Sequence, residues 1–419
     1  MATVKMVVMH LEPQAASMPS PSHTPGPADP LVADLVTLAR VPSAVPLGAD
    51  TLIEPDHPTL RHYVQECLRP MFQGLGALDI IDLPRNQFAV RLGDGAGPCL
   101  ALMAYTPTQH HNLMAEPWSG RIRTPVELGV DEPCVFGQGI TQNKAHQACL
   151  LDLARWIITE RVPLRGTLLL CVNNEGRSTH DCSNAILDGL PRTPDLLIQL
   201  FPTGFDVTVG NRGRVDVLVE IEGTTGHSSS PPAAGRVIDA AADVVRRLGE
   251  LDAVVRTRSH PELGHEQVVP YQVRYEPLAP HTLPARARIT VDRRLLPGSD
   301  PAAAIDEIRA AVEGAGTGCE ISVRQGVTML PAYLPPERRD VLDPLAASIR
   351  THVGEPRHTI YGGSFDAGGP SSRGIPTVMF GVPEEGDLLG DDYVRLSAVR
   401  RQAAVLRDTV THFFREQDR

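Results

Sequence analysis

The sequence is poor in aromatic residues, which make up 4% of its 419 residues, and it has no long apolar run. The missing run excludes a membrane-spanning helix, because a span needs about 20 consecutive apolar residues. The formal net charge of −11 argues against nucleic acid or an anionic membrane surface as a partner. Apolar content of 42% and charged content of 21% are typical of a soluble globular protein, and the length favours two domains.

The seven cysteines are scattered and form no CxxC pair. An odd number without a disulfide framework indicates reduced thiols, so we expect a cytoplasmic protein. Residues 1–30 do not resemble a signal peptide, and their Pro, Ser and Ala content predicts a disordered tail. Abundant Ala, Arg, Gly and Pro suggest a GC-rich bacterial genome.

Short apolar runs alternate with helical patterns in the first half of the chain. The runs at 99–104, 166–172 and 195–200 predict buried parallel strands, with a helix at 145–158. From residue 214 the pattern changes to half-buried strands, such as RVDVLVEIE at 214–222, accompanied by two helices. We therefore predict an α/β domain with a mainly parallel sheet over residues 31–213 and 330–419. An α+β lid or dimerisation domain is inserted at residues 214–329.

The most informative stretch reads VFGQGITQNKAHQACLL at 135–151. Its glycines allow a loop to pass close to a site, and the helix behind the loop begins with partial positive charge. Such a loop is suited to hold an anion or a metal-bound carboxylate. The loop itself contains no carboxylate, and the function depends on what Gln142 and Lys144 do in its place.

Several short motifs fall in one order between residues 118 and 377. They are Trp118 with FGQG at 136–139 and Lys144, NNEG at 173–176, FPTG at 201–204, RG at 212–213, GHSS at 226–229, DRR at 292–294, GGSFDA at 362–367 and GIPT at 374–377. Together they resemble the aminoacylase/carboxypeptidase family of di-zinc metallopeptidases, which includes acetylornithine deacetylase, succinyl-diaminopimelate desuccinylase, glutamate carboxypeptidase and allantoate amidohydrolase. The resemblance implies a zinc-peptidase-like α/β fold with an inserted lid, and a homodimer formed through that lid.

The sequence departs from the family at most of the metal positions. Zinc needs three or four nitrogen, sulfur or carboxylate ligands, and a two-metal mechanism also needs a bridging carboxylate. We therefore predict that the di-zinc site is absent and that the protein uses no cofactor. His110 and His111 are either a replacement ligand pair or solvated side chains. The family's ligand and base positions match Tyr105, Pro107, Gln142, Asn174, Phe201 and Leu388, and only Glu175 is retained.

Polar side chains remain at the same loops. Glu175 is predicted to be a general acid/base in a dry cleft, the alternative being a structural ion pair with Lys144 or Arg177. The resemblance implies that His227 on the lid donates to an oxyanion, often from a partner subunit. Arg212 and Arg294 are expected to bind a substrate carboxylate. The predicted substrate contacts are Tyr105, Gln142, Asn174, Lys144, Arg212, His281, Arg294 and Asp366.

Three functions are consistent with these residues. The first is a metal-independent enzyme that acts on an N-acyl amino acid, a dipeptide or a related carboxylate by acid/base chemistry, such as cyclisation, condensation or amide transfer. The second is a pseudo-hydrolase that serves as a binding or scaffold protein. The third is a metal-dependent amide hydrolase with unusual ligands. Replacement of Glu175 by Gln separates the first two, and sensitivity to a chelator indicates the third.

Overall fold

The computed structural model describes residues 29–45, 54–108, 114–175, 179–386 and 390–415. The predicted disordered tail therefore lies outside the described residues, except for its last two positions. Asp29 is the N-cap of the first helix, where its carboxylate accepts a hydrogen bond from the backbone N–H of Leu31. Pro30 is the first residue of that helix, a position that needs no N–H donor.

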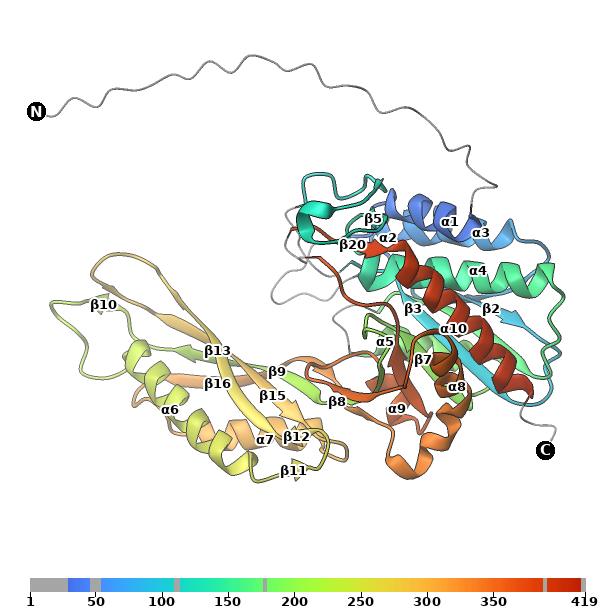
Figure 1. The fold of residues 1–419 in the computed structure, drawn as a ribbon. Coiled ribbons are helices and arrows are strands. Elements are labelled where there is room, and N and C mark those ends of the chain that lie inside the picture. Colours follow the sequence, from blue (N-terminus) through green and yellow to red (C-terminus); the bar gives the residue numbers. More distant parts are fainter. Residues whose placement is uncertain (1–28, 46–53, 109–113, 176–178, 387–389, 416–419) are drawn as a thin grey trace, which may run out of the picture.

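The largest sheet has nine strands, and its centre is the parallel set β6–β3–β7–β19. These four strands are almost continuously apolar because helices cover both of their faces (Figure 1). Short antiparallel strands extend the sheet at both edges. The strands are β1 (Asp79–Leu83), β2 (Gln87–Leu92), β3 (Cys99–Tyr105), β6 (Thr167–Asn173), β7 (Leu196–Leu200), β8 (Val207–Asn211), β17 (Ala332–Tyr333), β18 (His358–Tyr361) and β19 (Thr377–Phe380).

Helices lie on both faces of this sheet, and this arrangement confirms the predicted α/β class. The larger core is formed with α1, α3, α4, α8 and α10, and the smaller one with α5. The helices are α1 (Pro30–Ala39), α2 (Pro58–Arg61), η1 (His62–Leu68), α3 (Arg69–Gln73), η2 (Val126–Leu128), η3 (Ile140–Lys144), α4 (Ala145–Thr159), α5 (Asp181–Gly189), η4 (Pro336–Leu342), α8 (Asp343–His352), α9 (Gly368–Ser372) and α10 (Leu396–Arg415).

A separate four-stranded antiparallel sheet, in the order β13–β15–β9–β16, forms the lid together with α6 and α7 (Figure 1). Alternate valines of β9 face the two helices and are fully buried, which explains the alternating pattern of the sequence. The inserted α+β unit is thus present, while its exact boundaries stay predictions. Its elements are β9 (Gly213–Glu222), β10 (Gly226–His227), α6 (Val237–Val255), β11 (Ser259–His260), β12 (Gly264–His265), β13 (Gln267–Glu276), β14 (Thr282–Leu283), β15 (Arg286–Leu295), α7 (Pro301–Val312) and β16 (Glu320–Met329).

A small sheet, β20–β5–β4, positions the glycine-containing stretch before α4. Its strands are β4 (Ile122–Arg123), β5 (Cys134–Phe136) and β20 (Tyr393–Arg395). Because β20 comes from the C-terminal part of the chain, this pairing brings Asp392 beside Gly137 and Gly139.

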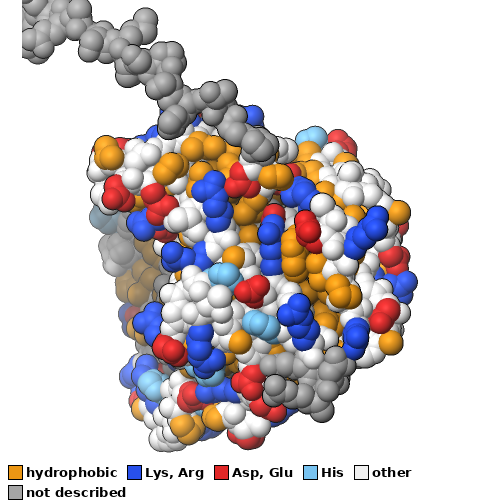
Figure 2. Space-filling model, turned by 45° about the vertical axis from the view of Figure 1, so that its right-hand side comes forward, with side chains coloured by type: hydrophobic (Ala, Val, Ile, Leu, Met, Phe, Trp, Pro, Cys, Tyr) orange, Lys and Arg blue, Asp and Glu red, His pale blue; other side chains and the backbone are white. Residues whose placement is uncertain are grey.

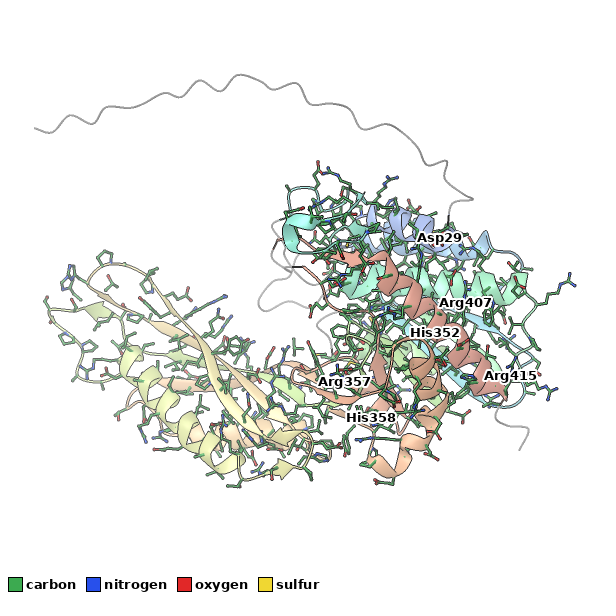
Figure 3. The ribbon with its side chains drawn as sticks, in the orientation of Figure 1. Asp29, His352, Arg357, His358, Arg407 and Arg415 are labelled. Atoms are coloured by element: carbon green, nitrogen blue, oxygen red, sulfur yellow. The ribbon has the colours of Figure 1, made fainter. Side chains whose placement is uncertain are left out.

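The C-terminal helix α10 is fixed to its neighbours by paired charges. Arg407 donates two short hydrogen bonds, of 2.7 and 2.8 Å, to the carboxylate of Asp152 on α4. His352 at the end of α8 lies 2.6 Å from the carboxylate of Asp408, and Figure 3 shows His352 and Arg407 on adjacent helices. Over the face drawn in Figure 2, charges of both signs are interspersed with apolar side chains. Among the helices in the described part of the chain, none has the length and apolarity to cross a bilayer.

The lid contacts the α/β domain through the turn between β11 and β12. The Glu262 carboxylate in this turn accepts hydrogen bonds from the Tyr333 hydroxyl and, at 2.7 Å, from the Arg339 guanidinium. The His260 ring packs edge-on against Tyr333, with centroids 4.5 Å apart. Arg212, where the chain enters the lid, donates to the backbone carbonyls of His265 and Gly362. The orientation of the lid is thus set by polar contacts close to the point of insertion.

Arg293 provides a test of the lid's core. Its side chain is 1% exposed and donates to the equally buried carboxylate of Glu266 at 2.5 Å. Replacement by Met removes a cation from beside the buried Glu266 carboxylate. Arg293→Met should therefore destabilise the lid by about 3 kcal/mol. The measurement is hydrogen exchange of the β15 amides. Arg286→Met, which removes an exposed pair with Glu222, is the control and should cost less than about 1 kcal/mol. Equal losses of stability in the two variants would contradict a stabilising role of the buried pair of Arg293 and Glu266.

Candidate functional site

Buried amide side chains hold the segment at residues 105–108, where β3 ends, in position. Asn143 donates to the backbone carbonyl of Thr106, and Gln147 donates to the carbonyl of Tyr105 at 3.2 Å. The hydroxyl of Tyr63 in turn donates to the Gln147 side chain at 2.5 Å. Because each of these polar groups is buried, breaking one hydrogen bond would leave a costly unpaired group. The loop therefore has one well-defined position at the carboxyl end of the sheet.

The glycine-containing stretch is joined to the C-terminal part of the chain by Asp392. Its carboxylate accepts hydrogen bonds from the backbone N–H of Gly139 at 2.6 Å and from the Thr141 hydroxyl at 3.1 Å. Burial raises the pKa of Asp392 to about 6, and these hydrogen bonds oppose the rise. Gly139 has φ +73°, and a Cβ at this position would lie 2.2 Å from the Thr108 hydroxyl, so only glycine fits.

Gln142 and Lys144 follow this glycine but point to different places. Gln142 is buried and hydrogen-bonds the hydroxyl of Tyr105, so two predicted substrate contacts lie together. Lys144 is fully buried and donates to the Val41 carbonyl at 2.9 Å, with its ammonium 4.3 Å from the centre of the Trp118 ring. Burial lowers the pKa of Lys144 to about 7. Lys144 thus links the stretch to the end of α1, and its predicted role as a substrate contact is not tested by this placement.

Asn174 and Glu175 follow β6 and are both buried. The Asn174 amide donates to the carbonyls of Arg85 and Asn86, in the turn between β1 and β2. One oxygen of Glu175 accepts from the backbone N–H groups of Cys182 and Ser183 at 3.0 and 2.8 Å, and from the Ser183 hydroxyl at 3.1 Å. The N-terminus of α5 therefore holds this carboxylate in place.

Asp366 on the loop at 362–367 and His180 before α5 complete this side of the site. Burial raises the pKa of the Cys182 thiol, and Glu175 and Asp366 both raise it further, so both carboxylates act on this thiol. The Nε2 atom of His180 accepts a hydrogen bond of 2.7 Å from the backbone N–H of Leu330, where the chain leaves the lid. Burial lowers the pKa of His180 to about 4, so this ring is neutral at pH 7.

The two arginines predicted to bind substrate stand at the junction of the lid and the α/β domain. Arg212 is engaged by backbone carbonyls and by Gln267 at 3.1 Å. Arg294 donates to Asp292 at 2.7 Å, while its Nε and Nη1 atoms have no hydrogen-bond partner among the described residues. Arg294 is therefore the better placed of the two to accept a substrate carboxylate.

His227 and His281 lie together on the exposed end of the lid, with ring centroids 5.9 Å apart. Figure 1 shows β10, which carries His227, at the end of the lid farthest from the α/β domain. Within one chain the structure therefore does not bring these histidines to Glu175. The Nδ1 atom of His227 is 2.7 Å from the Ser229 hydroxyl, which fixes the ring orientation.

Sequence reasoning missed three residues at this edge. Tyr361 and Phe365 flank the loop at 362–364 and pack on Phe201. Gln199 is fully buried beside Met103 and Met379, and neither amide atom has a hydrogen-bond partner in the described part of the chain. An aromatic residue on each side of a glycine-rich loop is a signal that could have identified the first two. Gln199 gave a weaker signal, as a single amide within an apolar strand.

A metal was tested against the side chains of this site. Among the residues that the structure describes, no group of three or more His, Cys, Asp or Glu side chains could hold a metal ion. His110, His111 and Leu388 lie outside the described residues. The described side chains by themselves therefore do not complete a metal-ligand set.

The lid matches a model of the peptidase dimerisation domain over residues 209–317. Succinyl-diaminopimelate desuccinylase from Dinoroseobacter shibae is 24% identical over 307 residues, which cover 69% of this chain and 78% of that enzyme. The desuccinylase from Erythrobacter litoralis is 26% identical over 174 residues, which cover 40% of this chain and only 44% of that relative. Because this match covers less than half of that relative, the activities of these enzymes are not established for this chain.

Solved structures share the fold along nearly the whole chain. A metallo-carboxypeptidase of the M20 family from Sulfolobus solfataricus has a TM-score of 0.72 at 13% identity, covering 92% of this chain and 99% of that one. A tripeptidase from Staphylococcus aureus has a TM-score of 0.67 at 16% identity, covering 92% and 98%. The fold and the lid are shared with peptidase-type proteins that carry a dimerisation domain. The chain is similar to the M20 peptidase family, of the aminoacylase/carboxypeptidase type.

These comparisons overturn the prediction that the protein uses no cofactor. A structural neighbour that shares the fold along nearly its whole length is a metallo-carboxypeptidase, and nothing in the described residues shows that this chain has lost the corresponding site. The prediction failed because it assumed that ligands occur only at the family's usual positions. Changed residues at those positions, such as Tyr105 and Gln142, do not show that a metal site has been lost.

Lys144 makes the stability of the α/β domain depend on pH. The unfolded chain carries this amine with its ordinary pKa of 10.5, whereas burial lowers the folded pKa to about 7. Between these pH values the unfolded state binds more protons, so the free energy of unfolding rises with pH. Between pH 7 and pH 9, the free energy of unfolding should increase by about 2 kcal/mol more in the native protein than in Lys144→Met. Denaturant unfolding at both pH values measures it, and an equal rise in the two proteins would contradict the assignment.

Proposed function

We propose that this protein hydrolyses the amide bond of a small N-acyl amino acid or dipeptide that carries a free carboxylate. The observation that carries the proposal is that Tyr105 ends β3 and Glu175 follows β6, so that both lie at the carboxyl edge of the parallel strands, where Asp366 also acts on Tyr105. Ligands bind at this edge in open α/β sheets. The named relatives, which include desuccinylases and a tripeptidase, act on amides of amino acids and support the same reaction class.

Glu175 is the proposed acid/base residue. Its three hydrogen bonds from Cys182 and Ser183 fix its position, which a base needs. It would take a proton from the attacking water and return it to the leaving nitrogen. Gln142 and the Tyr105 hydroxyl are proposed to orient the amide, and Arg294 to pair with the substrate carboxylate. Cyclisation, condensation and amide transfer have no separate support from this geometry.

A homodimer through the lid is part of the proposal. β13 is an edge strand of the lid sheet, and it carries exposed Val273 and Tyr275 next to α6, whose Ile238 and Val245 are also exposed. Apolar residues on an edge strand and an adjacent helix are typical of a surface that is covered by another chain. In such a dimer, His227 of one protomer would reach the site of its partner and stabilise the oxyanion.

The proposed base is tested by Glu175→Gln. The variant keeps the size of the side chain but cannot accept a proton, so the turnover of N-acyl amino acids and dipeptides should fall by at least about 100-fold. Hydrolysis is measured as released amine, both with added zinc and after treatment with a chelator. Glu160→Gln, at an exposed position, is the control and should keep full activity. Unchanged turnover in Glu175→Gln would contradict the role of Glu175. A native protein inactive on every substrate in both conditions would refute the function.

The shared site is tested by mixing two inactive variants. Glu175→Gln and His227→Ala should each be inactive, because each lacks one part of the catalytic machinery. Unfolding and refolding them together yields mixed dimers in which one of the two sites has both native residues. The mixture should recover about a quarter of the native activity.

No recovery in the mixture, with dimers confirmed by light scattering, would place His227 in its own chain's site. Full activity of His227→Ala alone would place His227 outside the site. Mixing Glu175→Gln with Glu160→Gln is the positive control. This pair should also recover activity, because one chain is fully competent.

A further inference from the structure

Four aromatic rings form one cluster in a chain that is only 4% aromatic. Phe201 and Phe365 have ring centroids 4.1 Å apart, and Tyr361 lies 5.6 Å from Phe201. Tyr105 contacts both phenylalanines, at 5.7 and 6.3 Å. Most of the side chains that pack against the rest of the sheet are aliphatic, so this group of four rings is a distinct feature of this part of the sheet.

The cluster lies where a ligand would meet the sheet. Tyr105 ends β3, Phe201 follows β7, and Tyr361 ends β18. Tyr105 and Phe365 are buried at 1% and 6% exposure, whereas Tyr361 is 38% exposed and Phe201 is half-buried. The cluster therefore has a closed inner side and an open outer side, and the open side is formed by Phe201 and Tyr361.

Charges of both signs flank the open side. Burial raises the pKa of Tyr361, Glu384 raises it further, and Arg294 lowers it, so both charges act on this ring. Glu384 is exposed and also acts on Tyr105. Arg294 keeps two nitrogens without hydrogen-bond partners in the described part of the chain, since only its Nη2 atom is bonded to Asp292. An aromatic surface between a cation and an anion suits an apolar group attached to a charged backbone.

We propose that Phe201 and Tyr361 form a specificity subsite for the aromatic side chain of an amino acid whose carboxylate pairs with Arg294. The inference rests on the proposed function and names its substrate class, namely amides of aromatic amino acids. Stacking on Phe201 and Tyr361 removes apolar surface from water and adds ring–ring contact. A carboxylate side chain at the same place would lose its hydration without gaining a cation, so acidic substrates are disfavoured.

The test is direct binding to the full-length protein by titration calorimetry, using N-acetyl-phenylalanine, N-acetyl-glycine and N-acetyl-aspartate. We expect N-acetyl-phenylalanine to bind at least about tenfold more tightly than the other two. Tyr361→Ala should remove this preference, because it removes half of the open aromatic surface. Tyr361→Phe keeps the ring and should keep the preference. Tyr361 is an exposed position, so both variants are expected to fold, and their melting temperatures check it.

The outcomes separate this inference from the proposed function. Equal affinity for the three ligands, or a preference that survives in Tyr361→Ala, would overturn the subsite whether or not hydrolysis is observed. A preference for N-acetyl-phenylalanine without hydrolysis of any amide would retain the subsite and refute the proposed reaction. Phe201→Leu provides a second measurement, and it should weaken binding of N-acetyl-phenylalanine more than that of N-acetyl-glycine.

Discussion

The parallel pairing of β3 between β6 and β7 is the constraint on which the site depends. It sets Tyr105 opposite Asn173 and Ala104 opposite Leu200. Segments that are 30 to 100 residues apart in the chain therefore end at one edge of the sheet, with every loop directed to the same side. A shift of one residue in this register would turn Tyr105 into the opposite core and remove it from Asp366 and Gln142.

Buried polar groups then fix the loops that this register brings together. Asn143 and Gln147 hold the loop after β3, while Asp392 holds the glycine turn from the other end of the chain. Each bond is buried, so its loss would cost about 1–3 kcal/mol in unpaired groups. The need to pair these buried groups explains why the stretch at 135–151 is rich in amide and hydroxyl side chains. Several polar residues of this stretch hold the backbone in position. A smaller number, of which Gln142 is one, face the site.

The sequence was sufficient for the architecture and insufficient for the roles of individual side chains. Apolar runs and alternation are local signals, so β3, β6, β9 and α4 could be predicted close to their observed bounds. Asn174 and Glu175 have partners in the β1–β2 turn and in α5, and no local pattern indicates which way such side chains turn. The same limit applies to metal ligands, because matching positions in a motif says nothing about ligands supplied from elsewhere in the fold.

Among the described residues, the contacts that hold the lid lie at the end close to the α/β domain. Near the α/β domain, Glu262 is bonded to Tyr333 and Arg339, and His180 holds the returning chain at Leu330. At the other end, His227 is exposed and contacts its own loop. A small rotation about the anchored end therefore displaces His227 more than any part of the junction. The position of this histidine depends on whatever covers the apolar strip of β13 and α6, so association of two copies would both supply the residue and set its place.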